Sequence, residues 1–144
     1  MVNTKVEDYA GDITSIEAWK ILKNDKSSLL IDVRSKAEWA YVGVTDLESI
    51  NKEAATIEWK NFPDMIINPN FVNQVKEICT SPEAIIFSLC RSGQRSISTS
   101  RALTEAGFKN CYNVLEGFEG DKDNKEHRGH IGGWKFYGLP WKQK

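Results

Sequence analysis

The sequence predicts an α/β domain in which a mainly parallel sheet is covered by helices on both faces. Short apolar runs alternate along the chain with segments of helical periodicity, which is typical of strand–helix repeats. The runs at 29–33 and 84–88 read as strands that are buried on both faces of a parallel sheet. With 144 residues, 40% of them hydrophobic and 27% charged, the chain has the size and balance of one globular domain, so we expect residues 1–144 to form a single domain.

The first half of the chain is predicted to contain two helices and two strands. Thr14, followed three residues later by Glu17, resembles a capping box and predicts a helix that ends near Asn24. The other elements are a buried strand at 29–33, a short helix over 36–41 and a short strand at 54–59.

The second half continues this alternation. Apolar residues at helical spacing predict a helix over 71–79, with Asn70 as its N-cap. Gly107 is well placed to end a later helix, because glycine is common just after a helix C-terminus. The elements around it are a strand at 84–88, a helix over 96–106 and a final strand at 111–115.

The composition changes after the last predicted strand. Residues 119–133 are charged and rich in glycine, which predicts a long surface loop. Residues 134–144 carry four aromatic side chains, and we expect them to pack back onto the domain as a short helix and an extended tail. His127 and His130 lie in the loop without an acidic cluster of recognisable spacing, so we expect no metal site.

Charge and cysteine usage restrict the partners and the compartment. A net charge of -1 argues against nucleic acid or an anionic membrane surface as the main partner. The first eight residues lack the apolar run of a signal peptide, and no later stretch is long enough to span a bilayer, so we expect a cytoplasmic protein. The chain has an odd number of cysteines, which are far apart in the sequence: Cys79, Cys90 and Cys111. This pattern favours free thiols in a reducing compartment over a disulfide framework.

Cys90 is the candidate nucleophile because of its position between a predicted strand and a predicted helix. Arg91 and Arg95 follow it in a short polar loop, and Gly93 permits a turn that a side chain would forbid. Backbone N–H groups in the first turn of a helix have no intrahelical partner and favour an anion. We therefore predict a reactive thiol in an anion-binding cradle, and ordinary buried thiols at Cys79 and Cys111.

Three motifs together resemble the single-domain form of the rhodanese family of sulfurtransferases over nearly the whole chain. They are Leu-Ile-Asp-Val-Arg at 30–34 followed by Glu-Trp at 38–39, Cys-Arg-Ser-Gly-Gln-Arg at 90–95, and Asn-Val-Leu-Glu-Gly at 113–117. The family pattern Gly-His-Ile-x-Gly-Ala is replaced here by Gly-Val-Thr-Asp-Leu at 43–47. The resemblance implies a rhodanese-like fold, a small anionic sulfur donor such as thiosulfate, and a thiol, protein or cyanide acceptor, with no metal or organic cofactor.

The resemblance also assigns roles to individual residues. Cys90 would be the catalytic residue that carries a persulfide. The rest of the loop would bind substrate, namely Arg91, Ser92, Gly93, Gln94, Arg95 and Ser96. Four more residues are expected near the site with mainly structural roles, namely Asp32, Arg34, Glu116 and Gly117. Arg34 is expected to pair with an acidic residue such as Glu38 or to line the rim of the site.

Two other functions remain open at this point. Cysteine phosphatases and some arsenate reductases carry an arginine six positions after the cysteine, whereas this chain has Ser96 there and Arg95 one position earlier. The shorter loop favours a pocket for a single sulfur atom. A noncatalytic interaction module is the other alternative, and the intact cysteine loop disfavours it.

Overall fold

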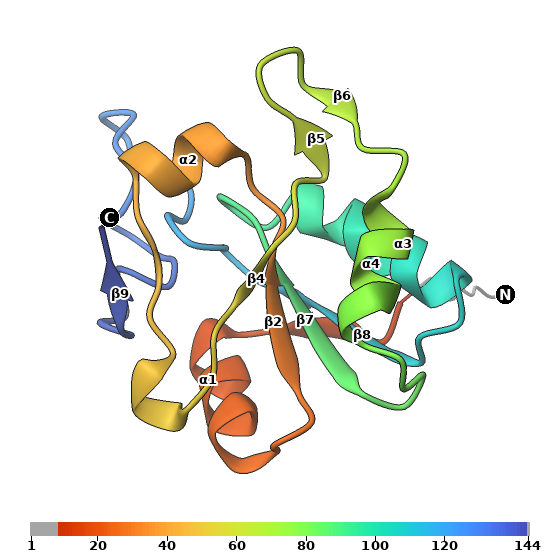
Figure 1. The fold of residues 1–144 in the computed structure, drawn as a ribbon. Coiled ribbons are helices and arrows are strands. Elements are labelled where there is room, and N and C mark those ends of the chain that lie inside the picture. Colours follow the sequence, from red (N-terminus) through yellow and green to blue (C-terminus); the bar gives the residue numbers. More distant parts are fainter. Residues whose placement is uncertain (1–8, 144) are drawn as a thin grey trace, which may run out of the picture.

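A computed structural model describes residues 9–143 as a five-stranded parallel sheet with helices packed on both faces (Figure 1). The strand order is β1-β8-β7-β2-β4, and every neighbouring pair is parallel. The strands are β1 (Gly11–Ile13), β2 (Leu29–Asp32), β4 (Ala55–Thr56), β7 (Ile85–Leu89) and β8 (Asn110–Val114). This confirms the predicted α/β class, because crossover helices connect parallel strands and must cover the sheet. Residues 1–8, from which the absence of a signal peptide was predicted, lie outside the described part.

Two hydrophobic clusters, one on each face of the sheet, form the core. One lies under α3 (Phe71–Ile78) and α4 (Arg95–Glu105), and the other lies under α1 (Ser15–Asn24) and the C-terminal segment. Side chains alternate between the faces along β7, so that Ile86 and Cys90 lie on the α4 face while Phe87 and Leu89 lie on the α1 face. Cys90 therefore continues the buried row of β7 beyond the end of the strand.

Helix ends follow local signals, with one correction. The Thr14 hydroxyl accepts the Glu17 N–H at 3.2 Å, as the capping-box pattern predicted. Asn70 is the N-cap residue of α3, as predicted, but its side chain makes no capping hydrogen bond. The side chain of Asn68 accepts the Asn70 N–H at 3.0 Å. Gly107 follows the end of α4 with a φ of +112°, so the predicted helix stop is confirmed.

Several short elements were not predicted. β1 pairs with β8 at one edge of the sheet, and the predicted strand at 54–59 is reduced to two residues. Two small antiparallel pairs flank the sheet: β3 (Val44–Thr45) with β9 (Trp141–Lys142), and β5 (Lys60–Asn61) with β6 (Ile66–Ile67). The 3-10 turn η1 (Glu48–Ile50) was not predicted either, whereas the short helix expected over 36–41 is confirmed as α2 (Lys36–Tyr41). No helix within residues 9–143 is both long enough and apolar enough to cross a membrane.

The C-terminal segment packs onto the domain without the predicted short helix. Trp134 is fully buried in the α1-side cluster, and its indole N–H donates to the Pro140 carbonyl at 2.7 Å. Turns carry the chain from there to β9, which pairs with β3. The predicted surface loop at 119–133 is exposed in its middle, but Gly120 and Gly132 are buried at its ends. Glycine fits there because a Cβ at Gly120 would lie 2.2 Å from the carbonyl oxygen of Gly132.

Candidate active site around Cys90

The carboxyl ends of three adjacent parallel strands bring the three sequence motifs together. The first motif continues from β2, the cysteine loop from β7 and the third motif from β8, and these strands are neighbours in the order β8-β7-β2. Parallel strands end at the same edge of a sheet, and open α/β sheets bind ligands at that edge. The site is therefore assembled by topology from segments that are far apart in the sequence, since the motifs begin at Leu30 and end at Gly117.

The Cys90 sulfur lies in a cradle of backbone N–H groups. The N–H of Gly93 donates to Sγ at 3.2 Å, and the N–H of Ser96, at the start of α4, donates at 3.3 Å. The side chain is 1% exposed, so these bonds form away from water. Amide donors that converge on one buried atom stabilise a negative charge on it. Both donors converge on the sulfur atom itself.

Ser96 connects Cys90 to the edge of the sheet through a polar chain. Its Oγ lies 3.1 Å from Sγ and also contacts the side-chain oxygen of Asn113. The Asn113 amide is oriented by donating to Asp12 Oδ1 at 3.0 Å, so its oxygen faces Ser96 as an acceptor. The single Ser96 hydroxyl proton therefore goes to Asn113, and a lone pair faces Cys90. Sequence reasoning had not identified Asn113 as a contact of this kind, although it begins the third motif.

Gly117 holds the cysteine loop against the segment that follows β8. A Cβ at this position would lie 2.3 Å from the carbonyl oxygen of Cys90, and the φ of +59° is itself unfavourable for a side chain. The close approach allows the Phe118 N–H to donate to the Cys90 carbonyl at 2.8 Å. The Glu119 N–H likewise donates to the Arg91 carbonyl at 2.9 Å. The structure thus gives Gly117 a specific backbone role beside the site.

Gly93 of the cysteine loop also packs closely against the segment after β8, at the backbone of Glu116. A Cβ on Gly93 would lie 3.1 Å from the Glu116 nitrogen, and Gly93 has a φ of +97°. The Glu116 side chain points to the C-terminal segment, where Oε1 accepts the Gly133 N–H at 3.3 Å. Its hydrogen bond with Tyr137 raises the pKa of that phenol. Glu116 therefore links the site to residues 133–137 and does not touch the sulfur.

Arg95 forms a two-pronged ion pair with Glu38, at 2.8 and 2.9 Å. Glu38 also completes a capping box with Ser35 at the start of α2, so the pair fixes this helix to the cysteine loop. Burial by itself raises the pKa of Glu38, but the hydrogen bonds and charge of Arg95 outweigh it and hold the pKa at about 2. The predicted contact of Arg95 with substrate stays a prediction, and the structure adds a structural role that the sequence did not reveal.

Asp32 and Arg34 form a second ion pair, inside the protein. Arg34 is fully buried and donates to both Asp32 carboxylate oxygens, at 2.9 and 2.6 Å. It also donates to the Gly43 carbonyl at 2.8 Å and lies over the Phe118 ring at 4.3 Å. The expected pairing of Arg34 with Glu38 is therefore wrong, because Asp32 is two residues away on the same strand end and Glu38 is taken by Arg95.

A cationic groove of ≈490 Å³ opens beside the loop. Its charged lining residues are four cations, Lys60, Arg91, Arg95 and Arg128, and two acids, Glu38 and Glu119, a surplus of two positive charges (4 − 2). Arg91 is exposed, and no hydrogen bond or ion pair to the rest of residues 9–143 holds its guanidinium. Such a groove attracts small anions. Sequence reasoning had not identified Lys60 or Arg128, since neither lies in a motif.

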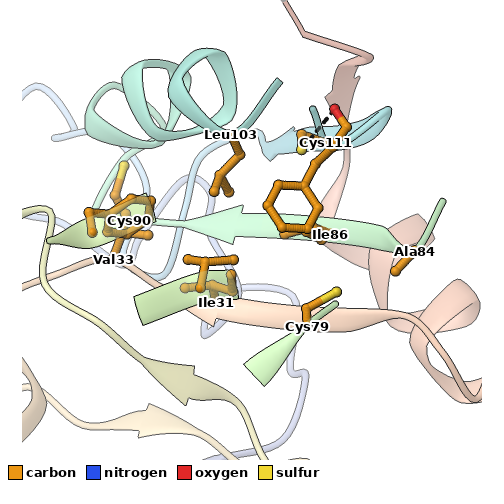
Figure 2. Packing of buried hydrophobic residues seen from close by; sticks show 11 residues of the cluster. Ile31, Val33, Cys79, Ala84, Ile86, Cys90, Leu103 and Cys111 are labelled. Atoms are coloured by element: carbon orange, nitrogen blue, oxygen red, sulfur yellow. Dashed lines mark hydrogen bonds between the residues drawn. The ribbon is translucent and has the colours of Figure 1, made fainter. Parts of the chain in front are cut away.

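The other two cysteines lie at the far end of the same core cluster (Figure 2). Cys111 pairs in register with Ile86, four residues before Cys90, which places it about 13 Å back along the sheet at about 3.3 Å per residue. Burial raises the pKa of the Cys111 thiol to about 11. Cys111 therefore does not lie where a resolving thiol for Cys90 would have to be.

The side chains of two further predicted substrate-binding residues, Ser92 and Gln94, do not take part in the contacts described above. Ser92 is half-buried, and Gln94 is exposed at the start of α4 without capping it through its side chain. Their role in binding stays a prediction. A larger cavity of ≈530 Å³ lies between Asp32, Thr45 and Lys142, and no residue of the cysteine loop lines it.

Comparison with known proteins places this site in a family. Residues 10–144 match the family model described as the STR4 middle domain. The chain belongs to the STR4 middle-domain family. An uncharacterized protein of Rickettsia conorii is 38% identical to this family member over 133 residues, covering 90% of this chain and 95% of the relative. Rhodanese-like domain-containing protein 17 of Arabidopsis thaliana is 31% identical over 103 residues, which is 71% of this chain and 62% of that protein.

Solved structures share the fold of this STR4 middle-domain protein. The crystal structure of Rv0390 from M. tuberculosis superposes with a TM-score of 0.86 at 44% identity, covering 94% of this chain and 99% of that one. The polysulfide-sulfur transferase homodimer from Wolinella succinogenes has a TM-score of 0.63 at 21% identity, covering 95% of this chain and 80% of that chain, which shows a shared fold alone. The fold is rhodanese-like, as the motifs predicted, while the matching family is the STR4 middle domain rather than rhodanese itself.

Proposed function

We propose that this STR4 middle-domain protein is a sulfurtransferase that carries a sulfane sulfur on Cys90. The observation that carries the proposal is the cradle of Gly93 and Ser96 N–H groups around the buried Cys90 sulfur. A thiolate is the nucleophilic form of cysteine, and converging amide donors favour it. The rhodanese-like fold and the cationic groove are consistent with an anionic sulfur donor.

The reaction proceeds in two displacements. The Cys90 thiolate attacks the outer sulfur of a thiosulfate-like donor, a new S–S bond forms, and sulfite leaves with the electron pair of the broken bond. A thiolate or cyanide then attacks the outer sulfur of the persulfide, and the electron pair returns to Cys90 Sγ. No net oxidation of the protein occurs, and no cofactor is required.

The cradle and the polar chain suit different steps of this cycle. The Ser96 lone pair faces Sγ and can accept an S–H group, whereas the Gly93 and Ser96 N–H groups that donate to Sγ would hold a thiolate. The outer sulfur of a persulfide extends about 2 Å beyond Sγ. Because Cys90 is only 1% exposed, the loop must open toward the groove when the donor binds.

Loop contacts count against phosphatase chemistry. A phosphatase needs an arginine that grips the phosphate oxygens, but Ser96 stands at that position and contacts Asn113. Arg95, one position earlier, has both terminal nitrogens bonded to Glu38. A tetrahedral oxyanion would therefore lack the two-pronged guanidinium contact that its recognition requires.

Intact mass spectrometry tests the proposal directly. Incubation with thiosulfate is expected to add one sulfur atom to the wild-type protein and none to Cys90→Ser, while Cys111→Ser is labelled like wild type. Addition of cyanide is expected to remove the sulfur and release thiocyanate. Absence of both the adduct and thiocyanate with a folded wild-type protein contradicts the proposal, and turnover of an aryl phosphate without sulfur transfer indicates the phosphatase alternative.

A further inference from the structure

The loop at 119–133 gathers three side chains that suit a transition-metal ion. One ligand atom each from Asp123, His127 and His130 lies within 4.8 Å of the other two. His130 Nδ1 is 3.1 Å from Asp123 Oδ2, and the two imidazole rings lie edge to face with centroids 5.6 Å apart. These residues take no part in the contacts around Cys90, so the cluster is separate from the proposed function.

The backbone of the loop holds Asp123 in place. Asp123 Oδ1 accepts the N–H groups of Lys125 at 2.8 Å and His127 at 3.0 Å. The Asp123 N–H in turn donates to the His127 carbonyl at 2.8 Å, which closes the turn. One carboxylate oxygen is thus occupied by the backbone, and the other, Oδ2, faces His130. Hydrogen bonds that orient a ligand in this way are typical of the surroundings of metal sites.

We propose that Asp123, His127 and His130 form a site for Zn²⁺. Two imidazole nitrogens and one carboxylate oxygen are ligands that zinc takes, with the fourth position left open to water or an anion. Bonds of about 2.0 to 2.1 Å in a tetrahedron separate the ligand atoms by about 3.3 Å. In the metal-free loop the three ligand atoms lie within 4.8 Å of one another, so they need to move only slightly closer together to bind the ion. Side-chain rotation provides this movement, because both histidines are exposed.

This proposal departs from the expectation of no metal site. Asp123 precedes His127 by four residues and His130 by seven, which matches no common ligand motif. Only the turn that Asp123 makes with its own loop brings the three side chains together. Two exposed histidines in a charged loop are otherwise uninformative.

A bound ion would also brace one wall of the groove. Arg128 lies between the two histidines in sequence and donates from Nη1 to the Gly120 carbonyl at 2.7 Å. The Gly129 N–H donates to the Glu119 carbonyl at 2.8 Å. A metal that joins Asp123 to His130 spans these contacts, so it would restrict the segment that presents Arg128 to the groove.

Calorimetric titration with ZnCl₂ tests the site in a Cys90→Ser background, which removes the candidate reactive thiol as a ligand. One Zn²⁺ per chain is expected to bind, and His130→Asn and Asp123→Asn are expected to weaken binding at least tenfold. Asp121→Asn is the matched control, because Asp121 is an exposed aspartate in the same loop outside the cluster, and its affinity is expected to equal the parent's. The side chain of His130 is 60% exposed, so its replacement does not disturb folding.

Zinc X-ray absorption of the loaded protein identifies the ligands. Scattering from nitrogen and oxygen alone is expected, with imidazole features that diminish in His130→Asn. A sulfur neighbour, an absence of binding, or equal binding by all variants overturns the proposal. Each of these outcomes is independent of sulfur transfer, so failure of the zinc site leaves the proposed function of Cys90 untouched.

Discussion

Replacing Gly117 with alanine is expected to destabilise the protein by about 3 kcal/mol, because two costs combine at this position. A residue with a side chain in the left-handed region costs about 1 to 2 kcal/mol, and Gly117 has a φ of +59°. The new Cβ would also lie 2.3 Å from the Cys90 carbonyl oxygen, which is backbone and cannot rotate away. Relief of this clash breaks the Phe118 N–H bond to that carbonyl, worth about 1 kcal/mol.

Gly138→Ala separates these two costs. Gly138 has a similar φ of +74°, but a Cβ there would have no atom within 4 Å, so only the conformational cost of about 1 kcal/mol applies. Urea unfolding followed by tryptophan fluorescence measures both variants, and an unchanged m-value shows that the folded state has stayed compact. Thiosulfate-dependent labelling of Cys90 is expected to fall in Gly117→Ala and to stay at the wild-type level in Gly138→Ala.

Equal stability and equal Cys90 labelling in the two alanine variants would refute this reasoning. It would mean that the loop after β8 moves freely relative to the cysteine loop. The Cys90 cradle would then not depend on the close backbone contact at Gly117.

The remaining predictions concern single side chains around the site. Glu38→Gln is expected to lose about 2 kcal/mol of stability at pH 7. The difference from wild type is expected to vanish as the pH falls from 4.5 through about 2, because the pKa of Glu38 is lowered in the folded state. Acid unfolding curves of the two proteins measure this difference in stability. Ser96→Ala is expected to cost about 1 to 2 kcal/mol in urea unfolding, since the buried Asn113 oxygen loses its donor, and unchanged stability would contradict the contact. Arg91→Gln is expected to raise KM for thiosulfate about threefold with little change in kcat, because it removes one exposed cation from the groove. Steady-state kinetics at low and high salt measure both constants. Cys111→Ser is expected to leave thiocyanate production unchanged, and a large loss of activity with an intact fold would show that this thiol takes part.

Much of the fold could be predicted because its signals are local. The buried runs that became β2 and β7 are largely apolar on both faces, and the caps at Thr14 and Gly107 need only neighbouring residues. β1 was missed because it has three residues and is defined by its backbone pairing with β8. The helix over 36–41 was predicted with the bounds that α2 has, and the Ser35–Glu38 capping box at its start is another local signal, Ser-x-x-Glu.

The candidate site was less predictable, since its contacts join distant segments. Sequence reasoning singled out Cys90 from its position between an apolar run and a helix. It could not identify Asn113 as the partner of Ser96, because this contact depends on β8 lying beside β7. It also could not identify Lys60 and Arg128 as walls of the groove, because each comes from a loop without a motif.

By itself the sequence determined the main helices, four of the five strands of the parallel sheet and the cysteine to test, because hydrophobic periodicity and loop composition depend on neighbouring residues. The tertiary structure alone decided which charges pair: Arg34 with Asp32, and Arg95 with Glu38. Ion pairs and hydrogen bonds form only over a few ångströms, and 57 residues separate Arg95 from Glu38. Only the folded chain therefore determines which charged side chains form ion pairs, which line the groove and which lie together as the proposed metal ligands.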